Sequence, residues 1–469
     1  ARHAAYFMDF LAERKGELTG PGQMAARREI GDEIDNIRAA WSHLAGEGRF
    51  PRQDALRALF RFLWMCGRYQ EGAQMAAQAL EGLDPVRLSA EEQLVRVALM
   101  TYSAQFAHAK GAVDSALVRV ETALVEAERI GSLAEVAHCY YAKGQIQTYL
   151  AYGKTRTQAA ENLRHALELY RHLEDDLGTA ETLYLLAYVL STLRSDPESC
   201  LSMLEESLEI LRRLGDASLQ ADALNNLGHV AWVAGAIDRS EQAYRQSLAA
   251  AVATEDRLVA AQAIGGLGLV AWVRADWDQA IALLKQRLEV MQQLGHMPQV
   301  QTSLFLLCSL YSHADRYPDA VALMHAYPDM WHTAWLAQTQ AGAGMCEEVM
   351  SYLPQLTESA SPGYSRGDIS HSLVAWSLLL EGECTLQTGQ GTPGARTLSR
   401  AERRALAEEI LSAVAIYPST DPATRAQARR LLARLFEEIG TKPPDHDRQS
   451  KPLRSIEDLT RQVLTISLA

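Results

Sequence analysis

Few residues in this 469-residue chain have the types and spacing that catalysis requires. Residues 363–367 read Gly-Tyr-Ser-Arg-Gly, which matches the GxSxG pattern that presents a nucleophilic serine in some hydrolases. That chemistry needs a β-strand before the serine and a helix after it, whereas a Ser- and Pro-rich stretch precedes this match. We therefore interpret Ser365 as part of a loop with no catalytic role.

The glycine, histidine and cysteine patterns also lack the spacing of a chemical site. Residues 265–268 read Gly-Gly-Leu-Gly, but they lie inside a predicted helix without the preceding strand of a phosphate-binding loop. The 13 histidines contain no HExxH pattern and the six cysteines contain no CxxC pair. Adjacent carboxylates such as Glu205 and Glu206 diverge on a helix. The sequence predicts a protein that is not an enzyme and that binds no cofactor and no metal.

A better candidate is a set of aromatic and hydrogen-bonding residues on one face of successive predicted helices. Asn225, His229 and Trp232 lie at positions i, i+4 and i+7, so they share a helix face. Aromatic rings beside amide and imidazole groups suit a groove that binds a ligand by stacking and a few hydrogen bonds. The predicted groove residues are Tyr141, Gln145, Tyr184, Tyr188, Asn225, His229, Trp232, Trp272, Trp64 and His108. The alternative is that these aromatic side chains only pack between neighbouring helices.

The elements that position these residues repeat along the chain. The sequence LGHVAWV at 227–233 recurs as LGLVAWV at 267–273, a separation of 40 residues. Each copy is followed by a turn and a second periodic run, at 239–251 and at 278–292. This pattern predicts pairs of antiparallel helices. Because one pair cannot bury its apolar face alone, neighbouring pairs must stack against it.

The repeat extends towards both termini, because small or apolar residues recur at the position equivalent to Gly228. Gly228 lacks a side chain, which lets the second helix of its pair approach closely. Positions equivalent to Gly228 recur every 40 to 44 residues. They are Phe60, Ala104, Gly144, Ala187, Gly228, Gly268 and Cys308.

These helix pairs resemble the tetratricopeptide repeat (TPR), which has Leu-Gly in its first helix and a small-to-large spacing in its second. The resemblance implies an all-α fold, a right-handed TPR superhelix from about residue 50 to about residue 416. In TPR proteins the first helices line a concave surface where partners bind. The best-known peptide sites use Lys and Asn to clamp a terminal carboxylate. Asn225 and Asn226 suit such a clamp, but no Lys accompanies them, and Arg57 and Arg61 lie several repeats away.

Two segments near the N-terminus resemble part of a larger family of regulators. RHAAYFMDFLAE at 2–13 and EIGDEIDNIRAAWSHL at 29–44 resemble the stretch that precedes the TPR array in bacterial STAND-class signal-transduction ATPases, the AfsR-like and LuxR/MalT-like regulators. In that family a nucleotide-binding domain comes first, and the TPR array is the sensor. No GxxxxGK[ST] motif occurs here, so the ATPase domain is expected upstream in a longer parent chain. The resemblance implies a non-catalytic sensor that controls a linked ATPase or transcriptional regulator. The alternative is a passive TPR scaffold.

The predicted organisation has four parts. Residues 1–45 form an N-terminal helical segment, with helices at 2–15 and 23–45; residues 46–330 form the TPR array; 331–440 hold degenerate hairpins and a capping helix; 441–469 are a linker and tail. Expected partners are a protein, peptide or small-molecule ligand in the groove, and the upstream ATPase domain.

The composition of the chain excludes some classes of binding partner. A net charge of −13 argues against direct binding of nucleic acid. No apolar run is long enough to span a bilayer, so no membrane partner is expected. Scattered cysteines suggest reduced thiols and a cytoplasmic location.

Overall fold

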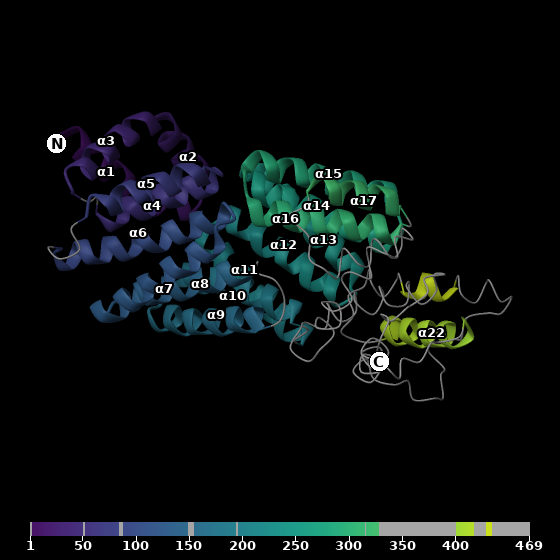
Figure 1. Ribbon diagram of the computed structural model, residues 1–469. Helices are drawn as coiled ribbons and strands as arrows, with labels where there is room; N and C mark the ends of the chain where they lie inside the picture. Colours follow the sequence, from purple (N-terminus) through teal and green to yellow (C-terminus); the bar gives the residue numbers. More distant parts are fainter. Residues whose placement is uncertain are drawn as a thin grey trace, which may run out of the picture. The chain divides into compact units, whose positions relative to one another are not determined.

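All regular elements in the described part of the chain are helices. The structure is a computed structural model, and it describes residues 2–49, 52–83, 88–148, 154–193, 196–314, 316–327, 400–416 and 428–433 (Figure 1). The chain divides into two compact units. The first comprises residues 1–151, 155–267 and 286–300, and the second comprises residues 152–154, 268–285 and 301–469. None of the described helices has the length and apolar character needed to cross a membrane.

The chain begins with three α-helices, where the sequence predicted two. They are α1 (Arg2–Arg14), α2 (Gln23–Asp32) and α3 (Ile34–Gly46), with a 3₁₀ turn at Glu17–Thr19. The single helix predicted at 23–45 is wrong, because Glu33 has φ −98° and ψ 10° and separates α2 from α3. Gly31, which costs about 1 kcal/mol relative to alanine inside a helix, lies two residues before this break.

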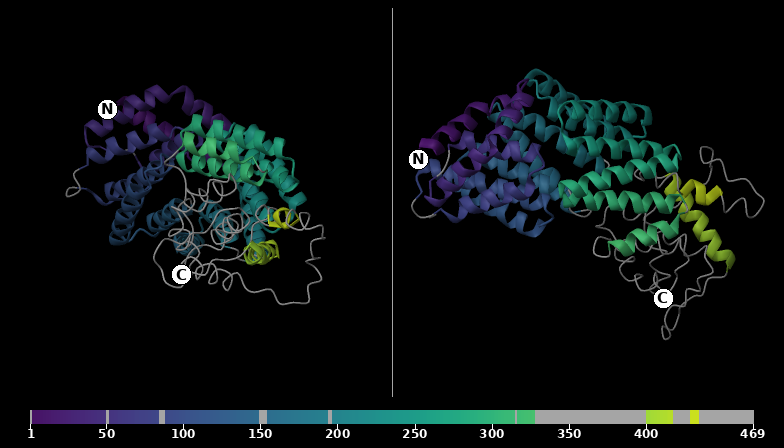
Figure 2. Two further views of the ribbon diagram at one scale, coloured as in Figure 1. Left: turned by 45° about the vertical axis from the view of Figure 1, so that its right-hand side comes forward. Right: turned by 90° about the horizontal axis from the view of Figure 1, so that it is seen from above.

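Antiparallel helix pairs follow. They are α4 (Gln53–Met65) with α5 (Tyr69–Glu81), α6 (Ala90–Ala109) with α7 (Val113–Ile130), α8 (Leu133–Thr148) with α9 (Lys154–His172), α10 (Asp176–Thr192) with α11 (Pro197–Leu214), α12 (Ala217–Val233) with α13 (Ile237–Ala253), α14 (Arg257–Val273) with α15 (Trp277–Leu294), and α16 (Met297–His313) with α17 (Tyr317–Ala326). In the first unit the first helices α4, α6, α8, α10 and α12 pack in series, and α5, α7 and α11 each pack against the next first helix (Figures 1 and 2). The predicted all-α stack of helical hairpins is confirmed.

The predicted core register is also confirmed. Phe60, Ala104, Gly144, Ala187, Gly228, Gly268 and Cys308 are all buried. A Cβ atom on Gly228 would lie 2.7 Å from Tyr244 of α13, and one on Gly268 would lie 3.2 Å from Leu284 of α15. Each of these contacts is with the second helix of the same hairpin. The glycines therefore allow the two helices of a hairpin to approach closely.

Apolar side chains in the first unit form successive clusters. One cluster joins α1–α3 to α4–α6 and contains Trp41, Phe60 and Phe106. A second joins α6, α7 and α8, and a third joins α8 through α12 around Leu163 and Leu204. The hairpins are therefore held to their neighbours mainly by buried apolar surface.

An aspartate caps the N-terminal end of α10, α12 and α14, each of which is the first helix of its hairpin. Asp175, Asp216 and Asp256 each accept a hydrogen bond from a backbone N–H three residues later, at 2.9, 3.0 and 3.1 Å. The preceding residue is left-handed in each case, including Glu174 with φ 54° and Gly215 with φ 76°. The left-handed residue ends one helix and the aspartate caps the next. This local sequence brings a carboxylate to the start of α10, α12 and α14.

Several predicted features lie outside the described residues. They are the part of the degenerate hairpins that lies at 331–399, which includes the loop containing Ser365, and the linker and tail at 441–469. Helix α22 (Arg400–Ile416) and the helical residues 428–433 lie in the region predicted to hold degenerate hairpins and a capping helix. The predicted domain boundaries stay predictions.

Candidate functional site

Three predicted groove residues lie in a row on α10 and α12, which we call the aromatic row. The Tyr188 ring lies 4.7 Å from the His229 ring, and the His229 ring lies 6.1 Å from Trp232. Tyr188 and His229 are half-buried and Trp232 is buried. Asn225 lies one turn before His229, and its buried Oδ1 has no hydrogen-bond partner among the described residues. The row thus combines partly exposed rings with an unused acceptor.

Three further predicted residues pack between neighbouring first helices. Tyr141 of α8 and Tyr184 of α10 are both buried, and burial together with neighbouring Tyr141 and Asp222 raises the pKa of Tyr184 well above its ordinary value. Gln105 of α6 donates a hydrogen bond of 2.9 Å to Gln145 of α8. These side chains contribute to packing between helices.

Trp64 and His108 lie apart from the aromatic row. The Trp64 ring packs against Tyr69, Phe106 and His296 at centroid distances of 5.2, 5.7 and 6.4 Å. His108 is buried, and burial and neighbouring His296 lower its pKa to about 3. Both residues therefore belong to a packed cluster at the N-terminal hairpins.

Trp272 belongs to the second unit. It is buried, and its ring packs edge-on against His313 at 4.9 Å. Its indole N–H has no hydrogen-bond partner within the described ranges. Its role in a groove stays a prediction.

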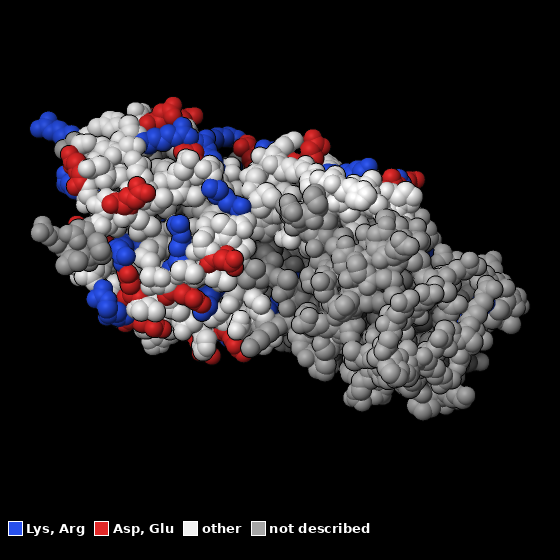
Figure 3. Space-filling view, in the orientation of Figure 1, with Lys and Arg blue, Asp and Glu red and all other residues white. Residues whose placement is uncertain are grey.

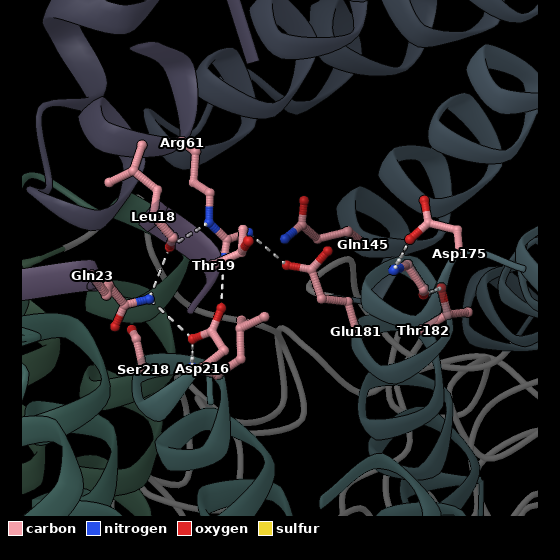
Figure 4. Close-up of polar contacts among 12 residues, drawn as sticks. Leu18, Thr19, Gln23, Arg61, Gln145, Asp175, Glu181, Thr182, Asp216 and Ser218 are labelled. Carbon is pink, nitrogen blue, oxygen red and sulfur yellow. Dashed lines mark hydrogen bonds and ion pairs between the residues drawn. The ribbon is translucent and has the colours of Figure 1, made fainter. Parts of the chain in front are cut away.

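Sequence reasoning missed an ionic cluster, which we call the arginine cluster. Arg57 of α4 donates to Glu135 of α8 at 2.5 Å. Arg61 of α4 donates to Asp216 at the start of α12 at 2.7 Å and to Glu181 of α10 at 3.4 Å (Figure 4). The side chains of Glu135 and Asp216 are fully buried, and that of Arg61 is 20% exposed. Carboxylates from three consecutive hairpins thus converge on two arginines of one helix.

Helix α2 adds polar contacts next to this cluster. The Gln23 side chain donates to Asp216 at 3.0 Å and to the Leu18 carbonyl at 3.0 Å (Figure 4). Arg27 donates to the Thr254 carbonyl, and Arg28 pairs with Glu255 at 3.3 Å. Gln23 and Asp216 are 193 positions apart in sequence, and Arg27 and Thr254 are 227 apart. The N-terminal helices therefore contact loops several hairpins later in the first unit.

Carboxylates outnumber arginines at the start of α10 and α12. Burial raises the pKa of Glu181 to about 7; Asp216 and Asp175 act in the same direction, and Arg61 opposes them. Burial, Asp256 and Glu181 raise the pKa of Asp222 well above its ordinary value. Arg61 opposes this shift. This part of the first unit has a local excess of acidic groups.

Glu135 differs from these two carboxyls. Burial alone would raise its pKa, but His138 and Arg57 outweigh burial and hold the pKa of Glu135 below its ordinary value. Glu135 therefore stays ionised at neutral pH and keeps its ion pair with Arg57. No group of three His, Cys, Asp or Glu side chains within the described ranges is placed to hold a metal ion.

A separate open cavity of about 590 Å³ lies between α3 and α5 in the first unit. Trp41, Arg38, Arg68 and Glu71 are among its lining residues. Arg38 pairs with Glu71 at 2.7 Å and Arg68 pairs with the same carboxylate at 3.3 Å. Both arginines are thus already neutralised. On the face shown in Figure 3, basic and acidic side chains are interspersed over the N-terminal helices, without one large patch of either sign.

Comparison with known proteins supports the repeat assignment. Residues 219–293, which span α12 to α15, match the family model described as Tetratricopeptide repeat. No curated protein matches the chain.

Several solved structures are similar to the chain at low sequence identity. The Rap protein complexed with competence and sporulation factor is 15% identical, with a TM-score of 0.46 over 76% of this chain and 99% of that one. NprR in complex with its cognate peptide NprX is 15% identical, with a TM-score of 0.48 over 71% and 100%. A STAND protein with a TPR sensor from Pyrococcus horikoshii is 12% identical, with a TM-score of 0.40 over 66% and 48%. In its described part, this chain is an all-helical stack of hairpins consistent with a TPR solenoid.

Proposed function

We propose that the protein is a TPR binding module that takes a peptide, or an extended segment of another protein, on the first-helix face of α10 and α12. We further propose that binding regulates a linked STAND-class ATPase or transcriptional regulator. The observation that carries the proposal is the aromatic row of Tyr188, His229 and Trp232 beside the unused acceptor of Asn225.

The chemistry of the row suits a peptide. Tyrosine and imidazole rings offer large contact areas and polar edges at a low cost in side-chain entropy. The unpaired Oδ1 of Asn225 can accept a hydrogen bond from a backbone N–H, and a buried acceptor without a partner costs about 1–3 kcal/mol. A peptide supplies such donors at regular spacing.

The regulatory part of the proposal rests on sequence. Residues 2–13 and 29–44 resemble the stretch that precedes a TPR sensor in STAND-class regulators. A regulator and a passive scaffold differ in whether binding changes the contacts of these N-terminal helices. If the protein is a passive scaffold, a peptide binds the row and leaves those contacts unaltered.

The test uses peptides selected from a phage-displayed random library on the full chain. The double variant Tyr188→Ala/His229→Ala is expected to bind the selected peptides at least tenfold more weakly, since buried aromatic anchors dominate binding energies. The matched control is Tyr140→Ala/His165→Ala, which removes a tyrosine–histidine pair 5.3 Å apart between α8 and α9. Equal binding by the wild type and both variants would place recognition elsewhere.

A further inference from the structure

The contacts of α2 and α4 with α8, α10 and α12 differ in chemistry from the rest of the first unit. The buried residues of the apolar cluster that holds α4 run from Ala4 to Ala109, with Leu294 packed against them, and those of the α8–α12 cluster run from Ala137 to Val230. These two clusters share no residue. A separate cluster of α6, α7 and α8 lies between them. Where α2 and α4 meet α8, α10 and α12, the side-chain contacts of Gln23, Arg57 and Arg61 are hydrogen bonds and ion pairs.

The two sides of this interface match in charge and spacing. Arg57 and Arg61 are four residues apart, so they project from one face of α4. Glu135 is the third residue of α8, and Asp216 caps α12. The N-terminal end of a helix stabilises a negative charge, so both positions suit a carboxylate that pairs with a cation. Arginine suits them because its planar guanidinium donates several hydrogen bonds in fixed directions.

We propose that Glu135, Glu181 and Asp216 form a docking surface for a helix that carries two arginines four residues apart, and that α4 is its resident, displaceable occupant. The proposal rests on contacts within the first unit and does not depend on peptide binding by the aromatic row. A partner helix with the same arginine spacing takes over these ion pairs, which releases α4 from α8, α10 and α12.

Exchange of one arginine helix for another is energetically feasible. A buried ion pair gains little net free energy, because the loss of hydration offsets the attraction between the charges. Separation of the whole interface returns both charged sides to water, whereas removal of one side alone leaves charges buried without partners. A competing helix restores every ion pair that α4 gives up.

The test uses a fluorescent alanine-based helical peptide with two arginines at i and i+4, and a control peptide with the arginines at i and i+2. On the control peptide the two arginines point to different faces. Fluorescence anisotropy is measured with the full wild-type chain and with the Arg57→Ala/Arg61→Ala chain, in which α4 no longer supplies the two guanidinium groups that pair with Glu135, Glu181 and Asp216. The expected result is that the i, i+4 peptide binds the variant at least tenfold more tightly than the wild type, while the control peptide does not distinguish them.

The matched control variant is Arg38→Ala/Arg68→Ala, which removes two arginines that pair with Glu71 inside the N-terminal hairpins. It is expected to bind the i, i+4 peptide as the wild type does. The proposal is overturned if Arg57→Ala/Arg61→Ala keeps its helical circular-dichroism signal and binds the i, i+4 peptide no better than the wild type.

If the double variant does not fold, a second measurement on the wild-type chain tests the docking surface. Hydrogen exchange of the wild-type chain is followed at residues 17–23 and 214–219, which meet at this interface. Faster exchange with the i, i+4 peptide than with the control peptide supports the proposal, and equal exchange overturns it. The Tyr188→Ala/His229→Ala chain should respond like the wild type, so this proposal and the proposed function fail separately.

Discussion

His108 and His296 show how burial sets charge at the residue scale. Burial and neighbouring His296 lower the pKa of His108 to about 3, and burial lowers the pKa of His296 to about 4. In the unfolded chain both imidazoles titrate near 6.5. Between pH 6.5 and about 4 the unfolded state therefore binds more protons, so these residues destabilise the fold as the pH falls.

We expect His108→Asn to remove the contribution of His108 to the pH dependence of the free energy of unfolding. Between pH 6.5 and 5.5 the wild-type free energy of unfolding should drop by about 1 kcal/mol more than that of the variant. Urea unfolding at several pH values measures the difference, and His172→Asn, at an exposed position, is the control. Parallel pH profiles for the wild type and His108→Asn would contradict the assignment.

A second residue-scale prediction concerns the core register. Gly228→Leu should lower the free energy of unfolding by about 1–3 kcal/mol, because its Cβ would lie 2.7 Å from Tyr244. Gly31→Leu is the control, since no atom outside its own helix lies within 4 Å of a Cβ there. Thermal unfolding that shows equal losses for the two variants would disprove the packing role of Gly228.

At the scale of elements, the sequence predicted the helix pairs well because each repeat carries its own signals. The 40-residue spacing, the small residue at Gly228 and the turn before α13 are all local features. The same local reasoning placed Arg57 and Arg61 several repeats away from the middle of the array. Arg61 nevertheless contacts Asp216, 155 positions later. A repeat pattern specifies how each hairpin meets its neighbour, and it carries no signal for a contact between distant hairpins.

Asp216 offers an element-scale prediction because it has two roles. Its carboxylate caps α12 and also accepts from the side chains of Arg61 and Gln23. Asp216→Asn keeps the cap and removes the charge, whereas Asp216→Ala removes both. Loss of a cap costs about 1 kcal/mol, so the alanine variant should be less stable than the asparagine variant by about that amount. Thermal unfolding compares them, and identical stabilities would show that the cap contributes nothing.

At the scale of the whole molecule, the stacking of hairpins brings residues that are far apart in the sequence onto one surface. Tyr188 and His229 are 41 residues apart in sequence, yet stacking of α10 on α12 brings their rings to 4.7 Å. The sequence placed both residues on one predicted face, because they share a register position, but it predicted no contact between them. It did not distinguish exposed from buried members of the set: Tyr141, Tyr184 and His108 are buried, and Tyr188 and His229 are half-buried. That distinction depends on which side chains cover each position, which the repeat does not encode.

The central claim is that the first-helix face around Tyr188 and His229 binds a peptide. Hydrogen exchange of the full chain, with and without a peptide selected on it, tests this claim most directly. We predict slower exchange in residues 184–192 of α10 and 225–233 of α12, with no change in α7, which lies outside the row. Protection confined to second helices such as α7 or α13, with α10 and α12 unchanged, would contradict the account.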